Sequence, residues 1–124
     1  MYRYVATAAI AACSMIGSGR VDASDLDGEV LFNTHCRNCH SAKAGDNRLG
    51  PSLHGIIGKP AGKVEGFTAY SGSLKDFTWD EATLDKFIAS PTSVAPNTSM
   101  IYPPVDNPAH RKAIIEFIKS SSSR

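Results

Sequence analysis

The sequence predicts an all-α domain in which three helices are joined by long irregular loops. Apolar side chains recur at helical spacing in three segments, and helix-capping residues precede each of them. Between the first two segments, residues 41–77 are rich in Gly, Pro, Ser and Lys and keep no sustained period of 3.6 or 2. With 42% hydrophobic and 20% charged residues, the 124-residue chain has the composition of one globular domain.

The first 23 residues are expected to be a secretory signal peptide. Arg3 supplies a short positive start, and mainly small and apolar residues follow from Val5 to Ile16. Val21-Asp22-Ala23 offers small or slender side chains at the two positions that a signal peptidase reads, which predicts cleavage before Ser24. The apolar run is shorter than the roughly 20 residues of a membrane-spanning helix, so stable membrane insertion is not expected.

Export leaves residues 24–124 as a single domain, with the periplasm as its expected location. This domain has eleven basic and eleven acidic side chains, so no basic patch favours nucleic acid as a partner. Of the three cysteines only Cys36 and Cys39 lie in it, because Cys13 falls in the leader. Lipidation of Cys13 is an alternative, since Ile10-Ala11-Ala12-Cys13 resembles a lipoprotein cleavage box. A domain this small lies near the lower limit that a polypeptide core alone stabilises, which favours a bound group in its interior.

The first helix is expected to run from Ser24 to about Asn38. Ser24 and Asp27 have the spacing of a capping box. The partly apolar face of this helix consists of Leu26, Val30, Leu31 and Phe32. The following loop, residues 41–77, is unusually long for a compact domain, and a loop that wraps a bound group explains such a length.

The second helix is expected between Thr78 and Pro91. Thr78-Trp79-Asp80-Glu81 has the pattern of a capping box, and a proline ends a helix at or before the preceding residue. The apolar residues at helical spacing in this segment are Leu84, Phe87 and Ile88.

The last helix is expected from Asn107, as the cap, to about Ser120. Pro108 suits the first helical position, and residues 120–123 are expected to form a frayed tail. The apolar side of this helix consists of Ile114, Ile115, Phe117 and Ile118.

The most informative motif is Cys36-Arg37-Asn38-Cys39-His40. Two cysteines three residues apart, followed at once by histidine, suit covalent haem attachment: each sulfur adds to one vinyl group and the imidazole reaches the iron. A zinc site needs two further ligands at comparable spacing, and a thioredoxin-like dithiol needs a βαβ context. The other histidines, His35, His54 and His110, are scattered. A haem-free dithiol or metal-binding module stays open as an alternative.

Met100 is the candidate for the second axial position of a haem iron. It is the only methionine outside the leader, and it lies sixty residues after His40. A lone methionine is usually part of a core, but Pro96-Asn97-Thr98-Ser99-Met100 has little else hydrophobic to pack beside. A loop position suits a ligand that approaches the iron from the opposite haem face.

Several motifs of residues 24–124 occur in the order of one known family. Gly50-Pro51-Ser52-Leu53-His54-Gly55 resembles a G-P-x-L-H-G loop, and Pro96-x-Thr98-x-Met100 resembles a P-G-T-K-M segment. The further matches are Gly28 and Phe32 in the first helix, Thr78-Trp79, and Ile114 to Lys119 in the last helix. Together they resemble the class I cytochromes c, specifically small bacterial cytochromes similar to the mitochondrial type. The resemblance implies the cytochrome c fold, with terminal helices that cross and loops wrapped around one haem c.

The resemblance also implies roles for individual residues. Cys36 and Cys39 would carry the haem through thioether bonds. His40 would be the proximal and Met100 the distal ligand of the iron. Three further residues would surround the haem. The Pro51 carbonyl would accept a hydrogen bond from the imidazole, and Tyr70 and Trp79 would donate hydrogen bonds to a propionate. The apolar residues expected to pack around it are Leu53, Ile56, Ile57, Trp79, Leu84 and Phe87.

The chain departs from the family pattern at three places. Lys59 stands where an arginine usually lies near a propionate, and an ammonium cannot make the bidentate contact. Phe87 replaces a tyrosine that often reaches the ligand sulfur. Thr92, Ser93 and Ser99 stand where mitochondrial relatives carry lysines around the haem edge, which predicts docking that depends less on salt.

The expected function is one-electron transport, with the iron cycling between the ferric and ferrous states. A His40/Met100 pair leaves no open coordination position, so an enzymatic role is not expected. Expected partners are redox proteins such as a cytochrome reductase complex, a terminal oxidase or a dehydrogenase, which a monomer would touch briefly. The alternative is a peroxidase-like or sensor module from whose iron Met100 dissociates.

Overall fold

The computed structural model describes residues 26–74 and 76–124, and within these ranges the fold consists of helices and loops without a strand. Its elements are α1 (Gly28–His35), α2 (Glu81–Ala89), α3 (Pro91–Val94) and α4 (Pro108–Ser121). The expectation of an all-α domain is confirmed. The expected leader, with Cys13 and the cleavage position before Ser24, lies outside the described residues. None of the helices in these ranges is long and apolar enough to cross a membrane.

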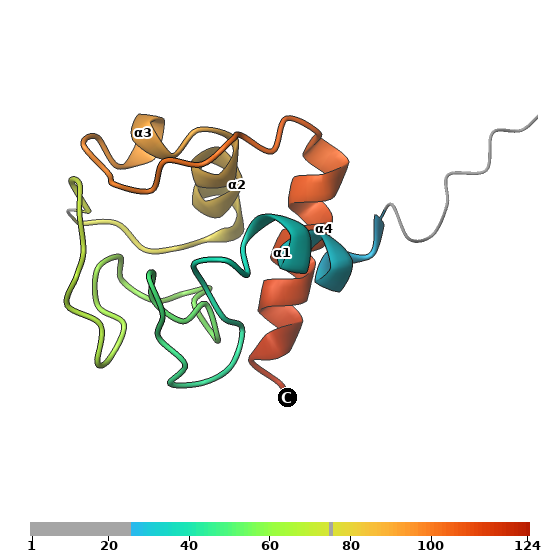
Figure 1. The fold of residues 1–124 in the computed structure, drawn as a ribbon, viewed down its shortest axis with the longest axis horizontal. Coiled ribbons are helices and arrows are strands. Elements are labelled where there is room, and N and C mark those ends of the chain that lie inside the picture. The colour runs from blue at the N-terminus through green and yellow to red at the C-terminus, as the bar shows by residue number, and fades with distance from the viewer. Residues whose placement is uncertain (1–25, 75) are drawn as a thin grey trace, which may run out of the picture.

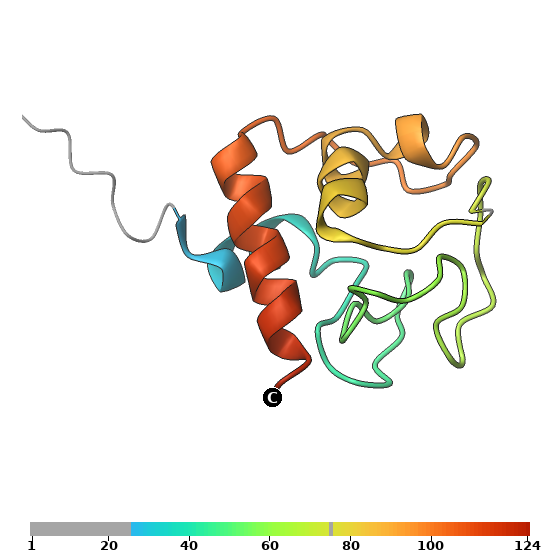
Figure 2. The same ribbon diagram turned by 180° about the vertical axis from the view of Figure 1, so that it is seen from behind.

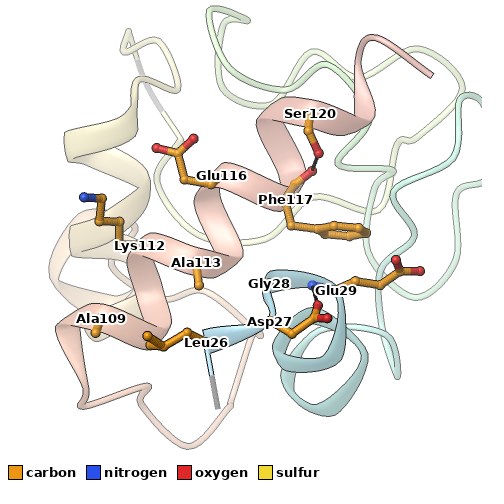
Figure 3. Close-up of a pocket in the computed structure, with 10 residues that line it drawn as sticks. All are labelled: Leu26, Asp27, Gly28, Glu29, Ala109, Lys112, Ala113, Glu116, Phe117 and Ser120. Atoms are coloured by element: carbon orange, nitrogen blue, oxygen red, sulfur yellow. Dashed lines mark hydrogen bonds between the residues drawn. The ribbon is translucent and has the colours of Figure 1, made fainter. Parts of the chain in front are cut away.

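Helices α1 and α4 cross at one side of the molecule, and α2, α3 and the long loop lie on the other side (Figures 1 and 2). The crossing depends on Gly28, because a Cβ atom there would lie 2.2 Å from the carbonyl oxygen of Ala113. Figure 3 shows Gly28 beside Ala113 and Phe117 of α4. The rings of Phe32 and Phe117 then meet with their centroids 5.2 Å apart, which extends the contact toward the core.

Helix α1 is shorter than expected. Its N-cap is Asp27, whose carboxylate accepts from the backbone N–H groups of Glu29 and Val30. The helix thus begins later than expected, and Ser24, the expected cap, lies outside the described residues. Leu31 and Phe32 are buried, but Leu26 and Val30 are about half exposed. Only part of the expected apolar face therefore packs inside the domain.

Helix α2 also begins later than its sequence pattern indicated. The Asp80 carboxylate accepts from the backbone N–H of Thr83 at 2.6 Å, which makes Asp80 the cap in place of Thr78. The helix ends before Pro91, as expected, but one further turn, α3, follows at once. This turn begins with Pro91, which is buried and suits a first helical position.

Helix α4 begins after Asn107, whose side chain accepts from the backbone N–H of Ala109, as expected. Arg111 connects it to its surroundings: the guanidinium lies 2.7 Å from an Asp85 carboxylate oxygen in α2 and 2.8 Å from the Val105 carbonyl oxygen. The expected frayed tail is wrong at Ser121, which is buried and belongs to the helix.

The long connection between α1 and α2 is irregular, as expected, but its middle is joined to its C-terminal end. Pro60 and Thr78 form an isolated antiparallel bridge. Backbone hydrogen bonds flank it, from Trp79 N–H to the Lys59 carbonyl and from Ala61 N–H to the Phe77 carbonyl, each 2.9 Å long. The bridge closes the second half of the loop on itself and places Phe77 and Thr78 beside Pro60 and Ala61.

Candidate functional site

A cavity of about 250 Å³ lies between the long loop and helix α2. Residues from distant parts of the sequence line it: Cys36, Cys39 and His40 at the end of α1, Tyr70 in the loop, and Met100 after α3. The other lining residues include Leu49, Pro51, Leu53, Ile56, Val64, Leu74, Trp79, Leu84, Phe87 and Ile88. None of the described side chains that line the cavity belongs to Asp, Glu, Lys or Arg, so its wall is almost entirely apolar.

A shallow and more open groove of about 540 Å³ lies between the start of α1 and α4 (Figure 3). Its lining residues are Leu26, Asp27, Gly28, Glu29, Ala109, Lys112, Ala113, Glu116, Phe117 and Ser120. They include no Cys, His or Met, so the groove holds none of the predicted site residues. The chemistry lies in the apolar cavity.

His40 is held in one orientation by backbone groups. Its Nδ1 atom lies 2.8 Å from the Pro51 carbonyl oxygen, the contact that the family resemblance implied. Because a carbonyl only accepts, Nδ1 carries the proton and Nε2 keeps its lone pair free. Burial lowers the pKa of His40, although the bond to Pro51 partly offsets this effect. A neutral imidazole with a free Nε2 is the form that binds a metal ion.

Gly50 presses the backbone against the His40 ring. A Cβ atom at residue 50 would lie 2.3 Å from Cε1 of His40, and the N–H of Gly50 donates to the Cys39 carbonyl at 2.8 Å. The sequence motif contained this glycine, but its contact with the imidazole could not be read from the motif because it depends on how the loop folds back. Gly50 and Pro51 together fix the ring.

The two cysteines differ in their surroundings. Cys36 is half-buried and packs against the core, whereas Cys39 is exposed, and no disulfide joins them. Burial, and secondarily the neighbouring Cys39, raises the pKa of the Cys36 thiol to about 12. A reactive dithiol needs a thiolate near neutral pH, so this environment does not suit a thioredoxin-like pair.

The segment that carries Met100 is held in place by polar contacts. Asn97 has a positive φ of 64°, a conformation that asparagine tolerates better than most side chains, and the family motif has glycine there. The turn allows the N–H of Thr98 to donate to the Ala95 carbonyl at 3.1 Å. Met100 itself is half-buried, and its N–H donates to the Thr98 hydroxyl.

A second loop supports this segment from the side. The Ser71 hydroxyl accepts from the Ser99 N–H at 2.8 Å and lies 2.6 Å from the Ser99 hydroxyl. At Gly72, which has a φ of 77°, a Cβ atom would lie 2.8 Å from the backbone nitrogen of Thr98. Sequence analysis missed Ser71 and Gly72, because serine and glycine are common in every loop and carry no local signal for a contact 28 residues away.

The predicted aromatic residues lie at the cavity wall. Trp79 is buried, and its ring meets those of Phe77 and Phe87 edge to face at 4.9 and 5.0 Å. Tyr70 lines the cavity, and its hydroxyl accepts from the Val64 N–H at 2.9 Å, which leaves the phenolic hydrogen free to donate. Lys59 lies elsewhere: its ammonium is 3.5 Å from the His54 carbonyl oxygen and does not line the cavity. Ile57 packs against the core and is not among the residues that line the cavity.

The donor set and the wall fit a covalently bound haem. A porphyrin needs a large apolar surface, two thiols for its vinyl groups and soft or imidazole ligands for its iron. The cavity brings together two thiols, one imidazole with a free Nε2 atom and one thioether in an uncharged wall. Within the described residues, no group of three or more His, Cys, Asp and Glu side chains could hold a metal ion by itself.

Comparisons with known proteins agree with these features. The chain is 43% identical to cytochrome c2 iso-2 of Magnetospirillum molischianum over 88 residues, which is 70% of this chain and 91% of that protein. It is 43% identical to cytochrome c2 iso-2 of Magnetospirillum fulvum over 68% of this chain and 90% of that protein. The solved structure of cytochrome cH from Methylobacterium extorquens matches with a TM-score of 0.67 and 35% identity, covering 76% of this chain and 95% of that one. No protein-family model matches the chain.

Proposed function

The chain belongs to the class I cytochromes c, which carry electrons with a covalently bound haem c, and we propose how its own residues hold and use that group. One observation carries the proposal. Two cysteines, one oriented histidine and one methionine, taken from segments up to 64 residues apart, line the same apolar cavity. Electron carriage is the function of the family, and the residue roles below are the proposal.

Cys36 and Cys39 hold the haem through two thioether bonds. Each thiol hydrogen and its sulfur add across one vinyl group, so no oxidant or reductant is consumed. Both sulfurs lie at the cavity wall, and Cys36 is packed against the core while Cys39 faces outward. Cys36 would thus hold the group from the core side and Cys39 from the solvent side.

His40 and Met100 would ligate the iron. The bond from His40 Nδ1 to Pro51 makes Nε2 the ligand atom and raises its basicity. Met100 is presented by a segment that Ser71 and the turn at Asn97 hold in place. When bound there, haem supplies one-electron chemistry by alternating between ferric and ferrous iron.

The chain acts as a carrier and not as an enzyme. With His40 and Met100 both on the iron, no coordination position remains for oxygen, peroxide or a substrate. Trp79, Leu84 and Phe87 fill the wall with apolar side chains, which excludes water from the ligand atoms. The peroxidase-like or sensor alternative requires a labile Met100, and the hydrogen bonds of its segment do not favour it.

The partners are redox proteins that dock at the exposed edge of the site. Cys39 and Leu49 line the site and are exposed, and Ile101, which follows Met100 in the sequence, is exposed as well; Leu49 and Ile101 have 80% and 95% of their surface open to solvent. Exposed apolar side chains suit short encounters through a small interface. A reductase complex, an oxidase or a dehydrogenase fits this description, and the chain acts as a monomer.

The proposed location is the periplasm. Residues 1–23 have the composition of a cleavable leader, and haem attachment through a Cys-x-x-Cys-His motif suits an exported chain. Cleavage before Ser24 would leave residues 24–124 as the functional domain. Mass spectrometry of the exported protein tests this directly, because a lipid on Cys13 or a retained leader would each add a defined mass.

Covalent attachment is tested by expression in an exporting bacterial host that matures c-type cytochromes. The purified chain should keep its haem through denaturing electrophoresis, and Cys36→Ala with Cys39→Ala should lose it. Arg37→Ala, which changes the exposed residue between the cysteines, is the matched control and should keep it. A parent chain that releases all haem on denaturation would refute the attachment.

A further inference from the structure

We propose that a hydrogen bond between His35 and Tyr102 latches the Met100 segment to the end of helix α1 and thereby limits how often Met100 leaves the iron. His35 and Tyr102 are positioning residues, because they act through Met100. The inference rests on the proposed ligation by Met100, and it adds a determinant of the stability of that ligation in this chain.

The latch joins two segments that are distant in the sequence but adjacent at the site. His35 is the last residue of α1 and directly precedes Cys36, whereas Tyr102 lies two residues after Met100. The His35 Nδ1 atom and the Tyr102 hydroxyl are hydrogen-bonded across 67 residues of sequence. Their rings meet edge to face, with centroids 6.1 Å apart and planes at 89°, and both side chains are half-buried.

Without this bond, the chain after Met100 has little else to hold it. Ile101 is 95% exposed, and the two residues after Tyr102 are prolines, which have no N–H to donate. In the described part of the chain, the next backbone hydrogen bond to another segment is a weak one of 3.4 Å, from Val105 N–H to the Ile88 carbonyl. Tyr102 is therefore the first attachment on the C-terminal side of Met100.

On the N-terminal side the segment is already fastened through Ser99, which donates its N–H to the Ser71 hydroxyl at 2.8 Å. Met100 thus lies inside a span of four residues, from Ser99 to Tyr102, held at both ends. Loss of the Tyr102 bond would extend the free span to Val105, and a longer free span lets the methionine sulfur move away from the iron more often.

The latch is tested by the rate at which cyanide binds to the ferric, haem-bound protein, because cyanide can bind the iron only after Met100 dissociates from it. Tyr102→Phe keeps the ring and removes only the hydroxyl. If the lost hydrogen bond has ordinary net strength, cyanide should bind to the variant about threefold to tenfold faster than to the parent. The ferric sulfur-to-iron charge-transfer band should persist, since Met100 remains the resting ligand.

Variants of His35 separate the hydrogen bond from the bulk of the side chain. His35→Leu should speed cyanide binding to the same degree as Tyr102→Phe, and the double variant should be no faster than either single one. In His35→Asn the amide oxygen stands as many bonds from the backbone as Nδ1 does, so this variant should retain most of the slow binding. Lys119→Met removes a 2.5 Å ion pair with Glu81 that lies away from the cavity, and it should leave the rate unchanged even if it lowers the unfolding temperature.

Unchanged cyanide binding in Tyr102→Phe and His35→Leu, with the charge-transfer band intact, would overturn the latch and leave the ligation standing. A parent protein that lacks the band and binds cyanide as fast as Met100→Ala would overturn the ligation by Met100, and with it the latch. The two failures therefore have different spectra.

Discussion

The His40 ring shows how single residues prepare the site. The Pro51 carbonyl accepts a hydrogen bond from the Nδ1–H group, and the Gly50 backbone lies so close that a methyl group at this residue would collide with the ring. Rotation of the imidazole would break the first contact and clash with the second. The ligand atom Nε2 is thus aimed before any metal is present, which reduces the cost of binding.

Phe87 should give this chain a reduction potential different from that of relatives that have tyrosine at this position. Its ring lines the cavity beside Trp79. We expect Phe87→Tyr to raise the reduction potential by on the order of tens of millivolts, because a hydroxyl that donates to the Met100 sulfur makes it a weaker electron donor to the iron. A redox titration of the parent and the variant measures this.

The control for this substitution is Phe67→Tyr, which adds a hydroxyl to another ring of the cavity wall. It should shift the potential less, because this ring lies in the long loop and packs edge to face on Tyr70. An equal or lower potential in Phe87→Tyr would show that the hydroxyl does not reach the sulfur.

The sequence predicted some residues of the site much better than others. Cys36, Cys39 and His40 form a contiguous motif, and Met100 was the only methionine left in a polar loop, so local patterns sufficed to select them. Their ligand roles await the experiments above. His35 was only one of three scattered histidines, and its partner Tyr102 could not be identified, since nothing within either segment encodes a pairing 67 residues apart.

Among the elements, the cap of α2 has a definite pH dependence. The backbone N–H of Thr83, hydrogen-bonded to the Asp80 carboxylate, lowers the pKa of Asp80 below its ordinary value of 3.8. A carboxyl whose pKa is lower in the folded state stabilises that state fully above the ordinary value. The stabilisation is lost as the pH falls through the lowered pKa.

Asp80→Asn should therefore be less stable than the parent at pH 7, with a difference that shrinks below about pH 3.8. Asparagine can still cap the helix, so the substitution removes the titrating charge and little else. Guanidinium unfolding followed by circular dichroism, at a series of pH values, measures the difference. A constant difference down to pH 2.5 would mean that the Asp80 charge has no part in it.

The crossing of α1 and α4 depends on the absence of a side chain at Gly28. We expect Gly28→Ala to lower the free energy of unfolding by about 1–3 kcal/mol, because its Cβ would lie 2.2 Å from the Ala113 carbonyl oxygen and force the helices apart. Denaturant unfolding measures this. Asn33→Ala, at an exposed position of the same helix, should change the stability by less than about 0.5 kcal/mol. Equal effects of the two substitutions would refute the close crossing.

The ends of the helices were predicted less well than the helices themselves. Ser24 and Thr78 each begin a pattern that fits a capping box, yet the caps are Asp27 and Asp80. In both segments an aspartate follows within three residues, and local sequence does not decide which of two competent caps the tertiary fold will use. The extra turn α3 was missed because four residues beginning with proline resemble a loop.

For the molecule as a whole, the near-neutral charge should determine how strongly the rate of electron exchange depends on salt. Thr92, Ser93 and Ser99 are exposed where basic relatives carry lysines. We expect the rate of electron exchange with a small anionic reagent, ferricyanide, to change little between low and high salt, because no concentrated positive field attracts the anion.

The matched variant restores charge to this edge. Thr92→Lys together with Ser93→Lys should accelerate the reaction with ferricyanide at low salt, and added salt should remove the gain. Stopped-flow kinetics across a series of ionic strengths measures both proteins. A steep loss of rate with salt in the parent chain would show that other cations already create such a field.

At the scale of the whole molecule, the polypeptide surrounds an apolar cavity. The long loop after α1 was predicted to be irregular because it lacks any period, and the structure closes it at the bridge between Pro60 and Thr78 around an apolar cavity. The small size of the domain indicated that a bound group fills part of its interior. The shape of the wall and the pairing of loops that form it are tertiary properties, and no local pattern contains them.

The central claim, that His40 and Met100 both ligate a covalently held haem iron, is tested most directly by the ferric absorption spectrum of the parent protein beside that of Met100→Ala. We expect a sulfur-to-iron charge-transfer band in the parent and its loss in the variant, since among the described residues Met100 is the only thioether that lines the cavity. A parent spectrum without this band, or a variant spectrum that keeps it, would refute the ligation by Met100.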